Sequence, residues 1–297
     1  MNKGIAYAIG AYGIWGLLPV YLKWLHAVPP LQVISHRILW SGLLLSAIVL
    51  LSRQWTAFRS TALTPRILRT YAIAALLIAI NWLTYIWAVD AGRIVEVSLG
   101  YFINPIISVV MGVVFLRERL RRWQWLPVGM VVIGVLYLTV SYGALPWLAL
   151  ILAFSFGTYG LIKKTAPLGA LYGLTLETGI LLLPALGWLL YADAAGSGAF
   201  LHGGVTMDSL LVAAGPVTAI PLLLFAAATQ RIPLTQIGIL QYISPTLQFL
   251  LGVLVYREPF THAQLIGYGI VWMALIIFAV ESLHAHRAQA VPAVVDF

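Results

Sequence analysis

The sequence predicts an all-α integral membrane protein with ten transmembrane helices, arranged as two inverted five-helix repeats. Three observations support this fold class. Of the 297 residues, 62% are hydrophobic and only 9% are charged, whereas a soluble domain carries about a quarter charged residues. The chain divides into apolar segments close to the roughly 20 residues that a helix needs to cross a bilayer. The second half of the chain also repeats a pattern found in the first half.

The repeated pattern recurs at a constant offset of 140 residues. Ile103-Asn104-Pro105 returns as Ile243-Ser244-Pro245, and Arg117-Glu118 returns as Arg257-Glu258. Each copy lies near the end of a hydrophobic half, so the chain contains two repeats of one unit. Because an odd number of spans falls in each half, the second unit must cross the membrane in the opposite direction. This arrangement is typical of alternating-access transporters.

The apolar segments are separated by Pro, Gly or charged residues, as expected for loops. We expect spans near residues 5–23, 33–52, 71–89, 96–116, 125–142, 146–163, 170–191, 209–228, 235–255 and 264–283. The first repeat then covers residues 1–144, the second covers 145–284, and 285–297 form a cytoplasmic tail. No small-residue cleavage site follows the first segment, so we expect a retained span and not a signal peptide.

Positive charges predict the orientation, because cytoplasmic loops carry an excess of Lys and Arg. A cytoplasmic N-terminus places thirteen of them on the inner side: Lys3, Arg53, Arg59, Arg66, Arg69, Arg117, Arg119, Arg121, Arg122, Lys163, Lys164, Arg231 and Arg287. The outer side then keeps only Lys23, Arg37, Arg93 and Arg257. We therefore expect both termini in the cytoplasm. Helical spans also indicate a bacterial inner (plasma) membrane, because outer-membrane barrels show alternating strands.

The composition and motifs exclude several classes of function. There is no cysteine, which excludes disulfides, thiolate metal sites and a cysteine nucleophile. The net charge of +8 sits in short loops, and no long basic segment with interleaved aromatic residues is available for nucleic acid. The chain contains no metalloprotease, serine-hydrolase or nucleotide-binding motif. We therefore expect no enzyme activity, no cofactor and no metal site.

Two prolines at equivalent positions of the repeats lie near the middle of their spans. Pro105 and Pro245 are about 14–15 Å deep if these spans begin near residues 96 and 235. Each proline removes a backbone donor and frees a carbonyl one turn earlier, and such groups are tolerated mainly where they face protein or water. We expect hinges here, with Pro19 and Pro221 as further hinge positions. A packing kink is the alternative.

Polar residues share a helix face with each of these two prolines. They occupy positions i, i+3 and i+7 in each repeat: Tyr101, Asn104 and Ser108 in the first, and Gln241, Ser244 and Gln248 in the second. Six hydrogen-bonding side chains at membrane depth should not face lipid. We favour cavity lining, and hydrogen bonding between neighbouring helices is the alternative.

Other spans supply further candidates for the cavity lining. They are Tyr12 and Trp15 in the first span, Asn81, Trp82 and Tyr85 in the third, and Ser155 and Tyr159 in the sixth. For each aromatic residue, packing in the core or at the membrane interface is the alternative. Together the candidates predict an aromatic, mildly polar cavity with few charges. Such a lining suits small amphipathic or aromatic solutes.

Three charged residues within the spans are candidates for charge recognition or coupling: Arg37, Glu96 and Glu177. Arg37 would hold a substrate carboxylate, or it would extend outward or bridge to Glu96 or Asp90. Glu177 would relay a proton, or a lysine at the end of the sixth span would neutralise it. The Arg-Glu pairs that close the fourth and ninth spans are interpreted as structural, with each Glu near the N-terminus of the following helix.

Several blocks of sequence together resemble one known family. They are Tyr12-Gly13-Ile14-Trp15-Gly16, His36-Arg37-Ile38-Leu39-Trp40-Ser41, Asn81-Trp82, Ile86-Trp87-Ala88-Val89, Ser98-Leu99-Gly100-Tyr101-Phe102-Ile103-Asn104-Pro105, Phe154-Ser155-Phe156, Tyr159-Gly160, Gln241-Tyr242-Ile243 and Pro245-Thr246. In these blocks the chain resembles the RarD branch of the EamA-domain transporters, within the drug/metabolite transporter superfamily. The resemblance covers all ten expected spans. Similarity to the amino-acid-exporting YddG-like members implies a basket of ten helices, with spans one, three, four, six, eight and nine around a central cavity.

The residues and the resemblance together predict an inner-membrane transporter that exports small metabolites by alternating access. Amino acids, including apolar and aromatic ones, are the expected solutes, and amphipathic drugs or toxic compounds such as chloramphenicol-like molecules are the alternative. A non-transporting membrane scaffold or receptor is the alternative from another class. A proton-driven pump would use Glu96 or Glu177, whereas a facilitator needs neither. We expect a monomer in the lipid bilayer, because two fused halves already complete a pathway.

Overall fold

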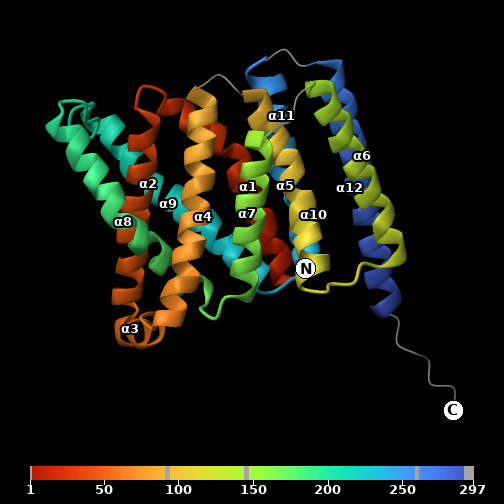
Figure 1. Cartoon of the computed structure of the whole chain (residues 1–297), viewed down its shortest axis with the longest axis horizontal. Helices are drawn as coiled ribbons and strands as arrows, with labels where there is room; N and C mark the ends of the chain where they lie inside the picture. Colours follow the sequence, from red (N-terminus) through yellow and green to blue (C-terminus); the bar gives the residue numbers. More distant parts are fainter. Residues whose placement is uncertain (1, 91–93, 144–146, 258–260, 291–297) are drawn as a thin grey trace.

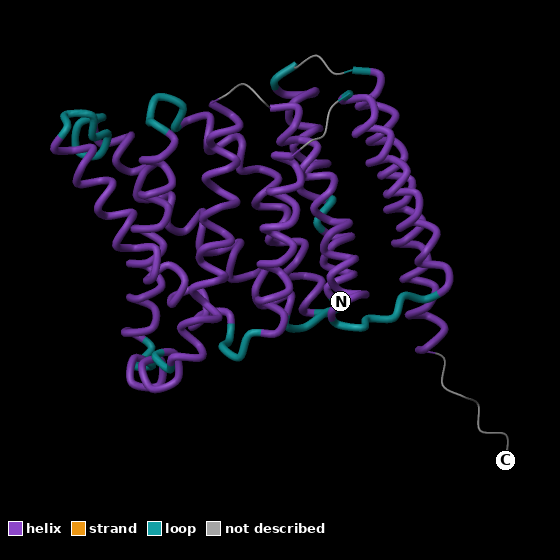
Figure 2. The backbone as a smooth tube through the Cα atoms, in the orientation of Figure 1, coloured by secondary structure: helices purple, strands orange, loops and turns teal. Residues whose placement is uncertain are grey.

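The computed structural model describes residues 2–90, 94–143, 147–257 and 261–290, and within these ranges every regular element is a helix (Figure 2). The elements are α1 (Lys3–Trp24), α2 (Pro30–Leu51), α3 (Trp55–Ala62), α4 (Pro65–Asp90), α5 (Ile94–Phe115), η1 (Arg122–Gln124), α6 (Trp125–Tyr142), α7 (Trp147–Thr165), α8 (Ala170–Ala194), α9 (Gly204–Thr229), α10 (Leu234–Leu240), α11 (Ile243–Leu250), η2 (Leu251–Val255) and α12 (His262–Ala290).

Seven helices of the described part are long and apolar enough to cross a membrane. They lie in α1, α2, α4, α6, α8, α9 and the segment Leu234–Val255, which includes α10, α11 and η2, and shorter apolar stretches lie in α5 and α12. The prediction of an all-α protein with several membrane-crossing helices is confirmed. The count of ten spans and the inverted relation of the two halves stay predictions.

The helices form a bundle in which segments from both halves of the chain interleave. Figure 1 shows α2, α8 and α9 towards one end of the bundle and the pair α6 and α12 at the other. Between them α5 packs on α7 and α10, and α1 packs on α9 and α11. The buried residues Tyr12, Tyr159 and Phe225 belong to one hydrophobic cluster at these contacts. The centre of the bundle is therefore built from helices of both halves.

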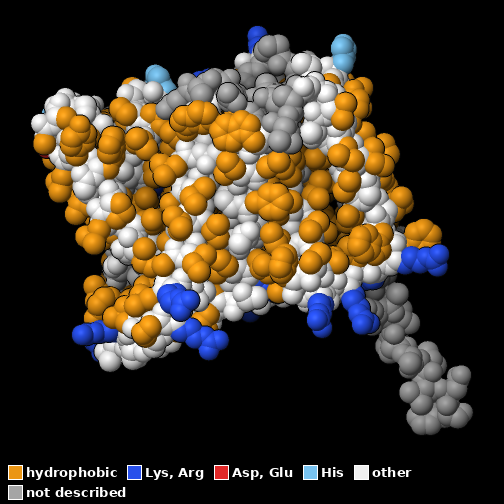
Figure 3. All heavy atoms as spheres, in the orientation of Figure 1, with side chains coloured by type: hydrophobic (Ala, Val, Ile, Leu, Met, Phe, Trp, Pro, Cys, Tyr) orange, Lys and Arg blue, Asp and Glu red, His pale blue; other side chains and the backbone are white. Residues whose placement is uncertain are grey.

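The outside of the bundle is apolar. In the view of Figure 3, hydrophobic side chains cover the middle of the face, and Lys and Arg gather along the lower edge, where Figure 1 places the N-terminus. Leu51, Val140 and Leu183 are 84%, 78% and 78% exposed. Soluble monomers rarely expose large contiguous apolar patches. This surface suits contact with lipid tails.

The two related prolines do not affect their helices alike. α5 continues through Pro105, whereas the helix is interrupted between α10 and α11, before Pro245. Pro245 is the third residue of α11, where its missing N–H breaks no helical hydrogen bond. The carbonyl oxygen of Gln241, one turn earlier, accepts a hydrogen bond of 3.2 Å from the backbone N–H of Ser244. The expected break is therefore present in the second repeat and absent from the first.

The segment that follows α5 is hydrogen-bonded to the second half of the chain. Arg117 has a φ of 54°, a left-handed conformation that is uncommon outside glycine. The carboxylate of Glu118 then accepts hydrogen bonds from the backbone N–H groups of Leu234 at 2.6 Å and Thr235 at 2.8 Å, at the start of α10. The expectation that this Glu reaches the next helix in the chain is wrong, because the turn directs it to the other half. Arg257, at the equivalent position, has a φ of 55°.

Candidate functional site

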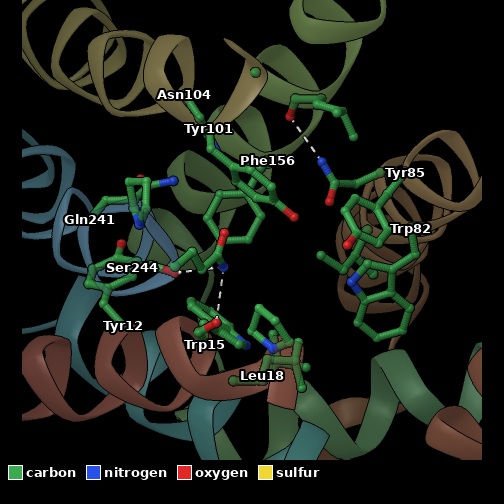
Figure 4. A pocket seen from close by; sticks show the side chains of 18 of the residues that line it. Tyr12, Trp15, Leu18, Trp82, Tyr85, Tyr101, Asn104, Phe156, Gln241 and Ser244 are labelled. Carbon is green, nitrogen blue, oxygen red and sulfur yellow. Dashed lines mark hydrogen bonds between the residues drawn. The ribbon is translucent and has the colours of Figure 1, made fainter. Parts of the chain in front are cut away.

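A cavity of about 140 Å³ lies in the centre of the bundle (Figure 4). It is close in size to an apolar cavity of about 150 Å³ that accepts benzene. Helices α1, α2, α4, α5, α7, α9 and α11 line it. Of the residues predicted from the sequence, the lining includes Tyr12, Trp15, Pro19, Arg37, Asn81, Trp82, Tyr85, Tyr101, Asn104, Gln241, Ser244, Pro245 and Gln248. The structure therefore brings together predicted residues that are far apart in the sequence.

Besides Glu177, which is described below, five of the predicted residues do not line this cavity. Ser108 is buried where Gly238 of α10 packs closely on α5, so α10 and not the cavity lies next to it. Pro105 borders a separate small cavity of about 20 Å³, and Pro221 is buried within α9. The other two, Ser155 and Tyr159, bond neighbouring helices.

Several lining residues were missed because they are apolar. Leu18, Ile78, Phe156 and Leu222 are among them, and polarity on a helix face does not reveal residues of this type. The spacing offered one signal for Phe156, which lies one turn before the predicted Tyr159 on the same helix. The cavity is consequently more apolar than the polar stripes alone indicated.

Three buried polar atoms around the cavity have no hydrogen-bond partner among the described residues. They are the hydroxyl of Tyr12, Oδ1 of Asn104 and Oε1 of Gln241, on side chains that are 1%, 6% and 5% exposed. A buried polar atom without a partner costs about 1–3 kcal/mol. These atoms come from α1, from α5 and from the break between α10 and α11. They can bond a molecule that occupies the cavity.

Other predicted polar side chains are engaged between helices. Asn81 Nδ2 donates to the carbonyl oxygen of Leu152 at 2.9 Å and to Ser155 Oγ at 3.0 Å. Gln248 Nε2 donates to the carbonyl oxygen of Trp15 at 3.1 Å (Figure 4). These two amide side chains therefore line the cavity and also form hydrogen bonds to neighbouring helices.

Arg37 lines the cavity and is held by two neighbours. Its Nε donates a hydrogen bond of 2.9 Å to Thr218 Oγ1, and its guanidinium carbon lies 4.7 Å from the ring centroid of Trp82. Within the described part of the chain, no carboxylate lies at ion-pair distance from it. The bridges expected to Glu96 and Asp90 fall on residues whose side chains the structure does not describe.

Four aromatic rings from α1, α7 and α9 pack together at the cavity. Trp15 lies 5.8 Å from Phe156 and 5.7 Å from Phe225, measured between ring centroids. Phe225 in turn stacks on Tyr159 at 6.1 Å, with an angle of 11° between the rings. Trp15 and Phe156 line the cavity, whereas Phe225 and Tyr159 are 1% and 0% exposed. We call these four residues the aromatic floor.

Glu177 lies behind the aromatic floor and not in the cavity lining. Its Oε1 is 2.8 Å from Lys163 Nζ, and its Oε2 accepts a hydrogen bond of 3.0 Å from the hydroxyl of Tyr159. Both charged side chains are 2% exposed. The lysine at the end of the sixth expected span therefore neutralises this acid. In the described part of the chain, no cluster of three or more His, Asp or Glu side chains could hold a metal ion.

The sequence and the fold both have close counterparts among known proteins. Residues 2–140 match the model of the EamA-like transporter family. The chain is 45% identical over 290 residues to the protein RarD of Streptomyces exfoliatus, covering 97% of this chain and 92% of that protein. It is 42% identical over 292 residues to the uncharacterized transporter YojE of Bacillus subtilis (strain 168), covering 97% of each. A solved crystal structure shares the fold at a TM-score of 0.70 with 18% identity, covering 93% of this chain and 97% of that chain. The chain is thus a multi-pass inner-membrane protein that belongs to the EamA-like transporter family, in the branch of the RarD proteins.

Proposed function

We propose that the chain is an alternating-access transporter that exports small metabolites, with amino acids as the solute class. One observation carries this proposal: polar atoms from both halves of the chain border a central cavity and have no hydrogen-bond partner in the described part of the chain. A scaffold that binds no solute has no need for such atoms, because each costs about 1–3 kcal/mol of stability. A transporter needs groups that a passing solute can bond and then release.

The proposed mechanism uses two inverted halves of five spans each, about residues 1–144 and 145–284. The φ angles of Arg117 and Arg257, 54° and 55° at positions 140 residues apart, support the repeat. We assign hinge roles to Pro105 and Pro245 and to Pro19 and Pro221, since a proline removes a helical hydrogen bond and a helix can bend at such a position. Two fused halves enclose the whole pathway, and we therefore propose a monomer.

The position of the cavity suggests which state the structure represents. The lining residues of α1 and α4 lie from the middle to the C-terminal ends of these helices, and those of α5 lie in its N-terminal half. This places the cavity towards the edge opposite the N-terminus in Figure 1. With both termini in the cytoplasm, the cavity is biased to the outside, and the aromatic floor blocks the cytoplasmic side. Export then requires the floor to open.

The alternative solutes are amphipathic drugs or toxic compounds such as chloramphenicol-like molecules. The aromatic lining would suit them, but the polar atoms and Arg37 favour a solute with charged or strongly polar groups. Energy coupling is a separate question. If Glu96→Gln and Glu177→Gln both leave the pH dependence of transport unchanged, the protein acts without proton coupling through these acids.

The experiment that tests the proposal is solute uptake into liposomes containing the purified protein, over a panel of amino acids and chloramphenicol. Asn104→Leu and Gln241→Leu should each lower uptake at least about tenfold, as expected when a polar group of a binding site is removed. Gln236→Leu is the matched control, because Gln236 is a half-buried amide outside the cavity. Uptake that neither cavity substitution affects would remove the cavity assignment, and a protein that moves no solute would refute transport.

A further inference from the structure

The positive charge in the cavity lining has no counter-ion among the described residues. Arg37 lines the cavity from α2. The hydroxyl of Thr218 accepts a hydrogen bond from Arg37 Nε. The two terminal nitrogens of Arg37 form no hydrogen bond with the described residues. A charge within a membrane protein is costly and is normally paired or functional. The cation is thus available to a molecule in the cavity.

The neighbours of Arg37 hold the guanidinium in position without neutralising it. The hydroxyl of Thr218 accepts at 2.9 Å, and the ring of Trp82 lies beside the guanidinium at 4.7 Å. Stacking on an aromatic face leaves the edge of a guanidinium free. That edge carries parallel N–H donors whose spacing matches a carboxylate, which it binds through two hydrogen bonds.

The atoms that lack partners lie on another side of the same cavity. Figure 4 shows Trp82, the ring beside Arg37, across the cavity from Tyr12 and Gln241. The unpartnered atoms of Asn104 and Gln241 are carbonyl oxygens, which accept hydrogen bonds. The cavity therefore has a cationic pole and an accepting pole, with an apolar lining between them.

We infer that Arg37 is the anion-binding residue of the cavity and selects solutes that carry a carboxylate, while Tyr12, Asn104 and Gln241 receive an N–H donor of the same solute. This assignment rests on the proposed function and deepens it. A small zwitterion with a carboxylate, an ammonium group and an apolar side chain fits both poles. A neutral amphipathic molecule leaves Arg37 without an anion.

The test compares matched compounds on the wild-type protein in detergent, using tryptophan fluorescence, since Trp15 and Trp82 line the cavity. Leucine is compared with leucinamide, which lacks the carboxylate, and with 4-methylpentanoate, which lacks the amine. Phenylalanine, phenylalaninamide and 3-phenylpropionate form the second set. Measurements at pH 6 keep the amines protonated, since an α-amino group has a pKa of about 7.7–8.0.

We expect the wild type to bind at least one amino acid about tenfold or more tightly than its amide, as expected for a charge-assisted hydrogen-bonded pair. Arg37→Gln should remove this preference by weakening only the carboxylate-bearing compounds, and Arg37→Lys should restore part of it. Gln241→Leu should instead reduce the preference for the amino acid over its deaminated analogue. Arg59→Gln, at an exposed arginine on α3, is the control and should behave as the wild type.

The outcomes separate this inference from the proposed function. Equal binding of acid and amide by the wild type overturns the inference whether or not a variant folds, and so does binding of none of the six compounds. An Arg37→Gln variant that weakens acid and amide equally overturns it as well. A wild type that prefers the acids but moves none of them into liposomes refutes transport and leaves the anion-binding role of Arg37 standing.

Discussion

Tyr242 donates a hydrogen bond of 2.9 Å from its hydroxyl to the backbone carbonyl oxygen of Phe102, and the two rings are 6.3 Å apart. These residues are separated by 140 positions, the same offset at which the sequence pattern repeats. If the halves are related by a twofold axis, a residue touches its own equivalent only near that axis. The contact therefore marks where the axis would pass, beside the break between α10 and α11.

Tyr242→Phe should destabilise the protein without altering the composition of the cavity lining. The substitution removes a hydrogen bond at a side chain that is 2% exposed, and the expected loss is about 0.5–1.5 kcal/mol. Thermal unfolding in detergent measures it. Tyr137→Phe, on the half-exposed face of α6, is the control and should leave the unfolding temperature unchanged. An unfolding temperature that Tyr242→Phe leaves unaltered would contradict a structural role for this hydrogen bond.

Asn104→Leu and Gln241→Leu should raise stability while they lower transport. Each replaces a side chain with an unpartnered buried oxygen by an apolar one of similar size, and removing such a group relieves about 1–3 kcal/mol. Opposite effects on stability and on transport are expected because residues of a functional site often reduce stability. Unfolding temperature and uptake are measured on the same preparations. A loss of both stability and uptake would indicate that these oxygens have a structural role.

How far these sites could be predicted depends on what a single helix reveals. Asn104 and Gln241 stand out because polar residues are rare in apolar segments, and the cavity includes both. Ser108 shares the helix face of Asn104, yet it does not line the cavity, because α10 packs closely on α5 at Gly238. That contact depends on tertiary packing and leaves no local signal. Phe156 was missed because an apolar lining residue resembles a core residue.

The charged residues show the same limit. For Glu177, the sequence allowed a proton relay or neutralisation by a nearby lysine, and the fold adds the partner that the sequence could not name, Lys163, whose Nζ lies 2.8 Å from the carboxylate. The partner of Glu118 could not be predicted from spacing, because it is the start of α10 in the other half of the chain. Helix positions were predictable, since apolar length is a local property. Contacts between helices were not.

Removing one partner of the buried pair of Lys163 and Glu177 should lower the free energy of unfolding much more than replacing both partners by apolar residues. Glu177→Gln leaves a buried ammonium group without its counter-ion, and the expected loss is about 3–5 kcal/mol. The double variant Lys163→Met with Glu177→Leu replaces both charges by apolar groups and should be more stable than either single variant. A double-mutant cycle of unfolding free energies measures the coupling. Additive effects of the two substitutions would show that the ions do not interact.

Gly238→Ala should separate α10 from α5 and lower both stability and transport. A Cβ atom at this position would lie 2.6 Å from the carbonyl oxygen of Pro105 and 3.1 Å from the Cβ of Ser108, so the helices must move apart. Gly179→Ala is the matched control, since no heavy atom lies within 4 Å of its Cβ position on α8. The control should gain up to about 0.5–1 kcal/mol, because alanine favours helix over glycine. Equal effects of the two substitutions would argue against close packing of α5 and α10.

The orientation of the chain can be tested with single thiols, because the sequence contains no cysteine. Ser60 is exposed on α3, and His202 is exposed between α8 and α9. If the ten expected spans are present, an odd number of crossings separates the two positions, so they lie on opposite sides of the membrane, and a cytoplasmic N-terminus places Ser60 inside. A membrane-impermeant maleimide should label His202→Cys in intact cells and Ser60→Cys only after lysis. The reverse pattern would place the N-terminus outside, and the cavity would then be biased to the cytoplasm, ready to load the solute and not to release it.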